Sequence, residues 1–364
     1  MNAPSQASVL FDEIPAGAFR IGVATLNRAG RMNALTLDMC SLSLERLRAW
    51  QSDEGIACVI LKGAGDKGFC AGGDVAQVIR EVRAGGPRRF VYGDAFFTVE
   101  YALDLLIHTF GKPLVSVAHG ITMGGGVGLT VGASHRVVGQ TLKMAMPEIH
   151  IGLFPDVGGG WFLNRTPPGV GLLMALTGLM IDEADALHAN LADWCLGEDA
   201  RARLPDSLAA LTWTGDARHD GAMLDTFFAA AAAPVGPSTL AANAAEIRRL
   251  SKLPDTVAYR DGLLALAQDD AWWRAPSRSL AQGSPTAAAV TWEYMRRSRK
   301  LSLAQTLQLD LVLAKACQRH QDFPEGVRAL LIDKDRTPRW SPPTFDAVDS
   351  QVVARHFDGA SPRG

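Results

Sequence analysis

Two carboxylates in a segment rich in proline and glycine are the residues best suited to acid–base chemistry. Glu148 and Asp156 lie eight residues apart in AMPEIHIGLFPDVGGG, residues 145–160. The residues around them, 144–146 and 151–154, are apolar, so we expect both acids at the edge of a core. Burial raises the pKa of a carboxyl group, which suits proton transfer near neutral pH. From the residues alone, a catalytic and a merely structural role stay equally open.

A glycine-rich segment could supply the backbone donors that such chemistry needs. GAGDKGFCAGGDV, residues 63–75, contains G-x-G-x-x-G directly after a strand-like run. Because FCAGG intervenes before a helix can start near Asp74, a dinucleotide-binding turn is disfavoured. The alternative is a tight turn at Gly72 and Gly73 that exposes backbone N–H groups at a helix start. Such groups stabilise a developing oxyanion.

A second glycine-rich segment, HGITMGGGVGL, occupies residues 119–129 and also lies between a strand-like and a helix-like run. Three consecutive glycines cost backbone entropy, so they require a structural reason. One interpretation is close packing of backbone against backbone. The other is a second N–H donor near Gly125 that faces the first turn, and both interpretations stay open here.

The remaining chemistry-bearing residues indicate less. Glu100 in FFTVEY lies inside an apolar helical pattern, where an acid is more often exposed or paired than part of a site. His119, His135 and His150 lack the spacing of metal ligands. No G-x-S-x-G nucleophile elbow occurs, and the 5 cysteines form no C-x-x-C pair, which disfavours a serine hydrolase, a thiolate zinc site and a disulfide framework.

The elements that must position these residues alternate in the first half of the chain. Short β-branched runs predict strands at residues 20–26, 57–62, 114–119, 136–138 and 142–146. Thr36 is a candidate N-cap, and apolar residues from Leu37 to Leu47 recur at the spacing of one helix face. Further helices are expected at 96–110 and after the glycines at 124–126. This alternation predicts an α/β fold with helices packed over a sheet.

The strand signal fades after about residue 165. The pattern predicts a helix end and a linker at 227–243, an alanine-rich stretch interrupted by prolines. Helices are expected at residues 172–176, 183–191, 246–250, 257–266 and 301–316. We therefore expect an α/β core in residues 1–200 and a helical C-terminal region in residues 201–364.

The composition excludes several classes of protein. The chain has 364 residues, of which 48% are hydrophobic, enough for a sizeable core. Its 36 basic and 38 acidic residues give a net charge of −2, so no basic field exists to bind nucleic acid or an anionic membrane. No apolar run approaches the ~18–20 residues that span a bilayer. Residues 1–15 lack the features of a targeting signal, so we expect a cytoplasmic protein.

Four motifs, in this order, resemble those of the crotonase (enoyl-CoA hydratase/isomerase) superfamily. They are NRAGRMNAL at 27–35, FCAGGD at 69–74, GITMGGGVGL at 120–129 and MPEIHIGLFPDVGGG at 146–160. With DFPEGVRALLIDKDRTPRW at 322–340 they are more similar to the 3-hydroxyisobutyryl-CoA hydrolase branch, over most of the chain. The resemblance implies a spiral of ββα units and a helical C-terminal region that closes over the acyl site.

The resemblance also implies roles for particular residues. The family holds a thioester carbonyl between two backbone N–H groups, which match Gly73 and Gly125. Arg28 and Arg31 match the segment that approaches the phosphates and ribose of CoA. Glu148 and Asp156 match the catalytic acids of the hydrolase branch. Glu100 matches an acid of that branch that contacts the substrate.

One departure separates the branches. Hydratases of the superfamily carry a first catalytic glutamate where this chain has Gly128, while their second one matches Glu148. The resemblance therefore implies hydrolysis of a short 3-hydroxyacyl-CoA, such as 3-hydroxyisobutyryl-CoA of valine breakdown. No metal or redox cofactor is expected, because CoA arrives with the substrate. An enoyl-CoA hydratase or isomerase and a non-catalytic acyl-CoA binder are the alternatives, and a homo-oligomer stays possible.

Overall fold

The computed structural model describes residues 7–359, which group into two compact units that interleave along the chain. The first unit contains residues 7–73, Ala102–Met144 and Ile181–Ser238. The second contains Asp74–Tyr101, Ala145–Met180 and residues 239–359. The expected boundary at residue 200 coincides with none of the borders between these units.

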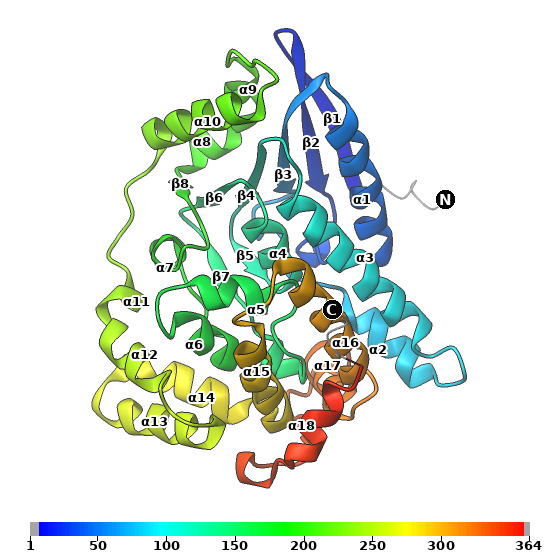
Figure 1. Ribbon diagram of the computed structural model, residues 1–364, viewed down its shortest axis with the longest axis vertical. Coiled ribbons are helices and arrows are strands. Elements are labelled where there is room, and N and C mark those ends of the chain that lie inside the picture. The colour runs from blue at the N-terminus through cyan, green and yellow to red at the C-terminus, as the bar shows by residue number, and fades with distance from the viewer. Residues whose placement is uncertain (1–6, 360–364) are drawn as a thin grey trace. The chain divides into compact units, whose positions relative to one another are not determined.

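A six-stranded sheet is the centre of the first unit (Figure 1). The first pair of strands is antiparallel and the other neighbours are parallel. Every residue of the fourth strand is buried, as is typical of a parallel strand covered on both faces. The α/β alternation expected from the sequence is confirmed. In sheet order the strands are β1 (Val9–Ala16), β2 (Phe19–Leu26), β3 (Ile56–Gly63), β4 (Leu114–Ala118), β6 (His135–Gly139) and β8 (Trp194–Leu196).

Two of these strands were not expected. β1 lies at the sheet edge and buries only its two end residues, so its sequence lacks the continuous apolar run of an inner strand. β8 has only three residues. The expected helix after Thr36 is confirmed: α1 (Leu37–Ser52) begins where the Thr36 side chain accepts a hydrogen bond from the Met39 N–H, and it contacts β1, β2 and β3.

Four helices of the first unit follow residue 180: α7 (Glu183–His188), α8 (Glu198–Ala202), α9 (Leu204–Ala209) and α10 (Ala217–Ala231). Their apolar side chains share one core with the sheet, where Leu208 and Phe228 pack in a cluster with Ile21 and Val137. This shared core explains why residues beyond 200 belong to the sheet unit. Helical sequence alone does not reveal which core a helix joins.

The glycine-rich segments lie on small elements of the first unit. β5 (Ile121–Met123) pairs with β7 (Lys143–Ala145) in a second, two-stranded sheet. α4 (Gly125–Val131) follows β5 at once, and all of its residues are buried. The strand-to-helix junction expected in HGITMGGGVGL is therefore present.

The second unit is mainly helical. α3 (Val91–His108) belongs to it as far as Tyr101 and then continues into the first unit. Beyond α10, residues 232–238 form no helix or strand, as the linker expected at 227–243 predicts. The other α-helices of this unit are α2 (Val75–Ala84), α5 (Gly159–Phe162), α6 (Val170–Thr177), α11 (Thr239–Ala242), α12 (Ala244–Leu250), α13 (Thr256–Asp269), α14 (Arg274–Gln282), α15 (Pro285–Ser298), α16 (Leu303–Cys317), α17 (Asp322–Val327) and α18 (Ser350–His356), and Arg328–Ile332 form a π-helical turn.

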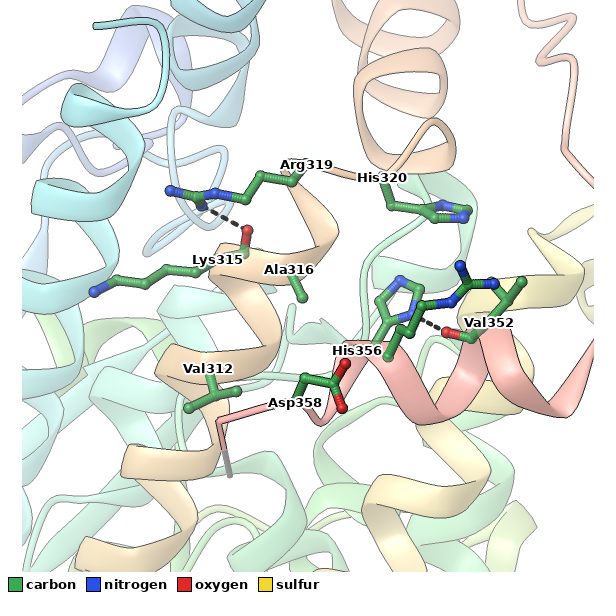
Figure 2. Close-up of a pocket in the computed structure, with 9 residues that line it drawn as sticks. Val312, Lys315, Ala316, Arg319, His320, Val352, His356 and Asp358 are labelled. Atoms are coloured by element: carbon green, nitrogen blue, oxygen red, sulfur yellow. Dashed lines mark hydrogen bonds between the residues drawn. The ribbon is translucent and has the colours of Figure 1, made fainter. Parts of the chain in front are cut away.

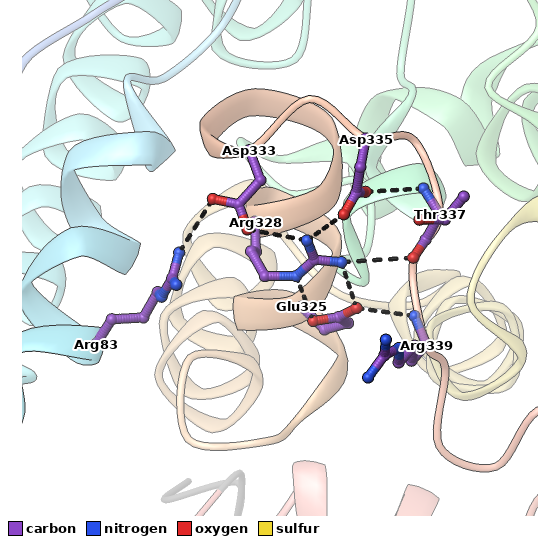
Figure 3. Close-up of polar contacts among 7 residues, drawn as sticks. All are labelled: Arg83, Glu325, Arg328, Asp333, Asp335, Thr337 and Arg339. Carbon is purple, nitrogen blue, oxygen red and sulfur yellow. Dashed lines mark hydrogen bonds and ion pairs between the residues drawn. The ribbon is translucent and has the colours of Figure 1, made fainter.

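The last of the sequence motifs, DFPEGVRALLIDKDRTPRW, is organised by one arginine. Figure 3 shows the Arg328 guanidinium among the carboxylates of Glu325, Asp333 and Asp335. Glu325 also accepts a hydrogen bond from the Arg339 N–H, at 2.9 Å. The segment therefore folds back on α17 through charge-assisted hydrogen bonds, which are stronger than neutral ones. No helix in residues 7–359 combines the length and apolarity needed to cross a membrane.

Candidate active site

Glu148 and Asp156 are brought together in a buried part of the second unit. Glu148 opens a short 3-10 helix (Glu148–Ile151), and Asp156 lies just before α5. Each residue is only 5% exposed. Burial raises the pKa of Glu148 well above its usual range, and the nearby charge of Asp156 raises it further. Burial also raises the pKa of Asp156, to about 6. The expectation that both acids lie at the edge of a core agrees with this burial.

The two carboxyl groups have different partners. The Tyr101 hydroxyl donates a hydrogen bond of 2.6 Å to Oδ2 of Asp156, which favours the ionised form of that acid. By contrast, Oε2 of Glu148 is buried and has no hydrogen-bond partner within residues 7–359. Burial therefore favours the neutral form of both carboxyl groups, and the hydrogen bond from Tyr101 opposes this effect at Asp156.

Tyr101 was missed by sequence reasoning, although its neighbour Glu100 was not. Both lie on α3, and Glu100 is 3% exposed, so it is buried rather than solvated. Burial raises the pKa of Tyr101, and the charges of Asp156, Asp310 and Glu100 raise it further. The tyrosine therefore stays a neutral donor. The available signal was FFTVEY itself, in which Phe97 and Tyr101 are one helical turn apart.

The two glycine-rich segments meet within the first unit. Gly72 has a φ of +95°, and a Cβ placed on it would lie 3.1 Å from the Met123 carbonyl oxygen and 3.7 Å from the Gly125 nitrogen. Within residues 7–359 neither the Gly73 N–H nor the Gly125 N–H donates a hydrogen bond. Gly125 is also the first residue of α4, where helix N–H groups have no partner in the helix. Two donors of the kind that stabilise an oxyanion are thus present.

The run of three glycines also allows backbone to pack closely against backbone, which was the first interpretation of this segment. A Cβ on Gly126 would lie 2.3 Å from the carbonyl oxygen of Cys70, a backbone atom that cannot move aside cheaply. Backbone hydrogen bonds connect the same segments, from the Met123 N–H to the Cys70 carbonyl and from the Cys70 N–H to the Ile121 carbonyl. Close packing and donor presentation therefore occur at adjacent glycines.

Asn33 holds the first glycine-rich segment, and sequence reasoning missed it. Its φ is +55°, a left-handed conformation that asparagine tolerates better than most residues. Its side-chain amide donates to the carbonyl oxygens of Ala64, Gly68 and Phe69, at 3.0, 3.1 and 3.1 Å. The side-chain oxygen in turn accepts from the Arg28 N–H. One buried amide thus connects NRAGRMNAL to the glycine turn.

The two arginines expected to approach CoA lie on the same loop. Arg31 ends a 3-10 turn (Ala29–Arg31) and its side chain is exposed. Arg28 is half-buried and donates from Nη1 to the Ala34 carbonyl at 2.6 Å. Contact of either arginine with CoA stays a prediction.

The geometry disfavours a dinucleotide-binding turn in the first glycine-rich segment. α2 begins only at Val75, so the glycines of G-x-G-x-x-G do not open a helix as a dinucleotide fold requires. Within the described part of the chain, no three His, Cys, Asp or Glu side chains gather as metal ligands would. A pocket beside α16 and α18 is lined by Lys315, Arg319, His320 and His356 among others, and by neither of the two acids (Figure 2).

The chain was compared with known proteins. Residues 21–357 match the model of the family described as enoyl-CoA hydratase/isomerase. A protein of Danio rerio named "3-hydroxyisobutyryl-CoA hydrolase, mitochondrial" is 35% identical over 100% of this chain and 92% of its own length.

Solved structures show the same fold. The structure of a carnitinyl-CoA dehydratase from Mycobacterium thermoresistibile has a TM-score of 0.85 and 35% identity, covering 97% of this chain and 96% of that one. An enoyl-CoA hydratase from Rhodobacter sphaeroides has a TM-score of 0.82 and 34% identity, covering 96% and 97%. The crotonase-like α/β fold and the resemblance seen in the motifs are both confirmed. This chain belongs to the crotonase, or enoyl-CoA hydratase/isomerase, family.

Proposed function

We propose that this protein hydrolyses the thioester of a short 3-hydroxyacyl-CoA, and that 3-hydroxyisobutyryl-CoA, from valine breakdown, is its substrate. The observation that carries this proposal is the buried pair of Glu148 and Asp156, in which burial raises the pKa of both carboxyl groups. Such a pair can take a proton in one step and return it in the next. The relatives named as hydrolases of this substrate, about 35% identical over nearly the whole chain, support it.

The glycine donors have a defined part in this reaction. Attack on a thioester places a negative charge on the carbonyl oxygen, and the Gly73 and Gly125 N–H groups would bind that oxygen. Removing one such donor from a comparable enzyme costs roughly 3–4 kcal/mol of transition-state stabilisation. Backbone donors are fixed by the fold, so they need no reorganisation when the charge develops.

The acids complete the proton balance. The reactive form of the pair has Glu148 ionised and Asp156 protonated. Glu148 then attacks the carbonyl carbon to form an acyl anhydride, or takes a proton from the water that attacks it. As the carbon–sulfur bond breaks, the proton of Asp156 passes to the thiolate of CoA. In the first route water then hydrolyses the anhydride, whereas in the second route the free acid is already released when the carbon–sulfur bond breaks. In both routes one proton of the consumed water returns to the pair and the acid leaves as its carboxylate.

Hydration of an enoyl-CoA is the second candidate. It is favoured by two solved structures that are similar to this chain and are titled as a dehydratase and a hydratase. Hydration adds water across a double bond and in this family uses two glutamates. Position 128, where the first would stand, is a glycine in a fully buried helix. Hydrolysis is therefore the better supported of the two.

The remaining expectations belong to the same proposal. The substrate is an acyl-CoA, and the chemistry above needs neither a metal nor a redox cofactor, so activity should survive dialysis against EDTA. We propose a cytoplasmic location, although the relatives are named as mitochondrial, and fractionation of the source cells would decide this. Assembly into a homo-oligomer stays a prediction.

Release of free thiol from a panel of CoA thioesters tests the proposal. The panel contains 3-hydroxyisobutyryl-CoA, 3-hydroxypropionyl-CoA, and isobutyryl-CoA and methacrylyl-CoA as matched saturated and enoyl esters. We expect the two hydroxyacyl esters to be cleaved fastest, before and after EDTA treatment. Binding of all four esters without thiol release would contradict the proposal and favour the non-catalytic binder.

A further inference from the structure

The backbone directly after Asp156 is strained. Val157 has a φ of +52° and is 1% exposed. A β-branched residue in the left-handed region is a genuine outlier, because its Cβ approaches the following carbonyl oxygen. Such a conformation costs free energy and persists only where the surroundings enforce it. The residue that turns the chain away from Asp156 is therefore held in place by something else.

Two side chains from the C-terminal helices enforce this turn. Oδ2 of Asp310, on α16, accepts a hydrogen bond from the Gly158 N–H at 2.7 Å. The hydroxyl oxygen of Tyr294, on α15, accepts one from the Gly160 N–H at 2.7 Å. Asp310 and Tyr294 are both fully buried, and the Gly159 N–H between these contacts donates to the Asp156 carbonyl at 2.7 Å.

The packing around the turn leaves it little freedom. The Tyr294 ring lies edge-on to Phe154, with ring centroids 4.9 Å apart. A Cβ on Gly160 would lie 2.6 Å from Cζ of Tyr294, so the chain passes directly against this ring. Residues 154 and 160 are therefore both fixed by Tyr294, on either side of Asp156.

We propose that Asp310 and Tyr294 are positioning residues for Asp156, which hold the strained turn Val157–Gly160 so that the carboxylate keeps its bond to Tyr101. The inference rests on the proposed function for its effect on rate, but not for its effect on geometry. Neither residue touches the substrate. Both act through the backbone of the turn.

The chemical state of Asp310 makes a clean test possible. Its Oδ1 is buried and has no hydrogen-bond partner within residues 7–359. Burial raises the pKa of Asp310 well above its usual range, and the charge of Asp156 raises it further. Asparagine has the same shape and keeps an oxygen that can accept from Gly158. Leucine has a similar volume but no acceptor.

The experiment compares Asp310→Asn, Asp310→Leu and Tyr294→Phe in turnover of 3-hydroxyisobutyryl-CoA. We expect Asp310→Asn to keep kcat within about 3-fold, and Asp310→Leu to lower kcat by about 10–100-fold with KM within about 3-fold, because small misplacements of reacting groups cost this much. Tyr294→Phe keeps the ring and should lower kcat in the same direction. An equal loss in Asp310→Asn and Asp310→Leu would overturn the proposal.

Asp322 supplies the matched control. It is another buried aspartate of the same unit, and it accepts hydrogen bonds from the Ser284 hydroxyl and the Ser341 N–H. Asp322→Leu should lower the melting temperature as Asp310→Leu does, while the folded enzyme keeps its kcat. If Asp322→Leu loses kcat to a similar extent, the effect at Asp310 is explained by general destabilisation, and the proposal is overturned.

A crystal structure of Tyr294→Phe, and of Asp310→Leu if it folds, tests the geometry without any turnover. We expect Val157 to leave the left-handed region and the 2.6 Å bond from Tyr101 to Asp156 to be lost. An unchanged turn in these variants would overturn the inference. If the wild-type protein cleaves no thioester but the turn relaxes, the proposed function fails while the positioning inference stands.

Discussion

Within residues 7–359, Glu148 keeps one buried oxygen without a hydrogen-bond partner, whereas Asp156 accepts a hydrogen bond from Tyr101. A buried polar atom that lacks a partner costs free energy, and a site tolerates that cost where the atom will meet a ligand. Oε2 of Glu148 is therefore the atom we expect to face the reacting carbonyl or its water. The bond from Tyr101 fixes the direction of the Asp156 carboxylate.

Glu148→Gln is expected to abolish thioester hydrolysis while binding of the CoA ester survives within a few-fold. An amide can neither attack nor accept the proton, and such groups contribute ~10²–10⁴-fold to rates. Single-turnover thiol release gives the chemical step, and calorimetry with 3-hydroxyisobutyryl-CoA gives the affinity. Glu246→Gln, at a partly exposed glutamate paired with Arg249, is the control. Near-normal turnover by Glu148→Gln would remove Glu148 from the mechanism.

Asp156→Asn should damage turnover of hydroxylated esters more than that of unsubstituted esters of equal length. A site that binds a hydroxyl through a hydrogen bond discriminates strongly against ligands that lack it. The comparison is kcat/KM for 3-hydroxyisobutyryl-CoA against isobutyryl-CoA, in wild type and variant. Equal losses on both esters would show that Asp156 acts only in proton transfer.

The same variant should be more stable than the wild type at high pH. Because the folded-state pKa of Asp156 is raised to about 6 from 3.8, the folded protein binds this proton more tightly than the unfolded chain does. The stabilisation from the proton is complete below about pH 4 and is lost as pH rises through 6. Asp156→Asn removes this loss, so we expect the free energy of unfolding at pH 8 to be about 1–3 kcal/mol higher in the variant than in the wild type.

Thermal or urea unfolding at pH 8 and pH 4.5 measures this difference. The gain should shrink at pH 4.5, where Asp156 of the folded wild type is already protonated. A variant that is less stable than the wild type at pH 8 would contradict the raised pKa. A carboxylate that destabilises the fold is what a functional rather than a structural acid is expected to be.

At the scale of elements, the glycine-rich junction before α4 can be tested through its packing. Gly126→Ala places a methyl group 2.3 Å from the Cys70 carbonyl, so backbone must shift and the turn beside Gly125 must move. We expect a loss of stability of about 1–3 kcal/mol and a larger proportional loss of kcat than of ester affinity. Gly236→Ala has open space around its Cβ and should change neither. Equal behaviour of the two variants would contradict the packing role.

Much of the fold could be predicted from local patterns, because inner parallel strands and capped helices leave local signals. The strands around Val115 and Ile60 and the helix after Thr36 are examples. The edge strand β1 could not be predicted in the same way, because most of its residues face solvent. It could also not be predicted that α9 and α10 belong to the first unit, because the strand residues against which they pack lie far away in the sequence.

For the candidate site, the acids and glycines could be found because their residue types are unusual in their surroundings. The side chains that hold these acids and glycines in place could not be found from the sequence. Asp310 and Gly158 are 152 residues apart, and an aspartate on an amphipathic helix gives no local sign of its partner. Asn33 resembles any turn asparagine until its three carbonyl partners are known.

At the scale of the whole molecule, the two compact units divide the candidate groups between them. The glycine donors and both arginines belong to the first unit, and Glu148, Asp156 and their supporting side chains belong to the second. Neither unit is a continuous stretch of chain, so neither can be removed by a simple truncation. The decisive test therefore compares two reactions of the whole protein rather than of a fragment.

Wild-type protein should release CoA from 3-hydroxyisobutyryl-CoA far faster than it hydrates crotonyl-CoA. Hydration needs a positioned water and two proton transfers, and the glycine at position 128 removes one of the two acids that this family uses. Since one acid–base group contributes ~10²–10⁴-fold, the residual hydratase rate should be weak. Gly128→Glu should not restore it, because every residue of α4 is buried and a new carboxylate there would have to lose its hydration. Loss of the enoyl absorbance and appearance of free thiol, followed in parallel on one preparation, measure both rates. Hydration equal to or faster than hydrolysis would overturn the proposed function and establish the hydratase instead.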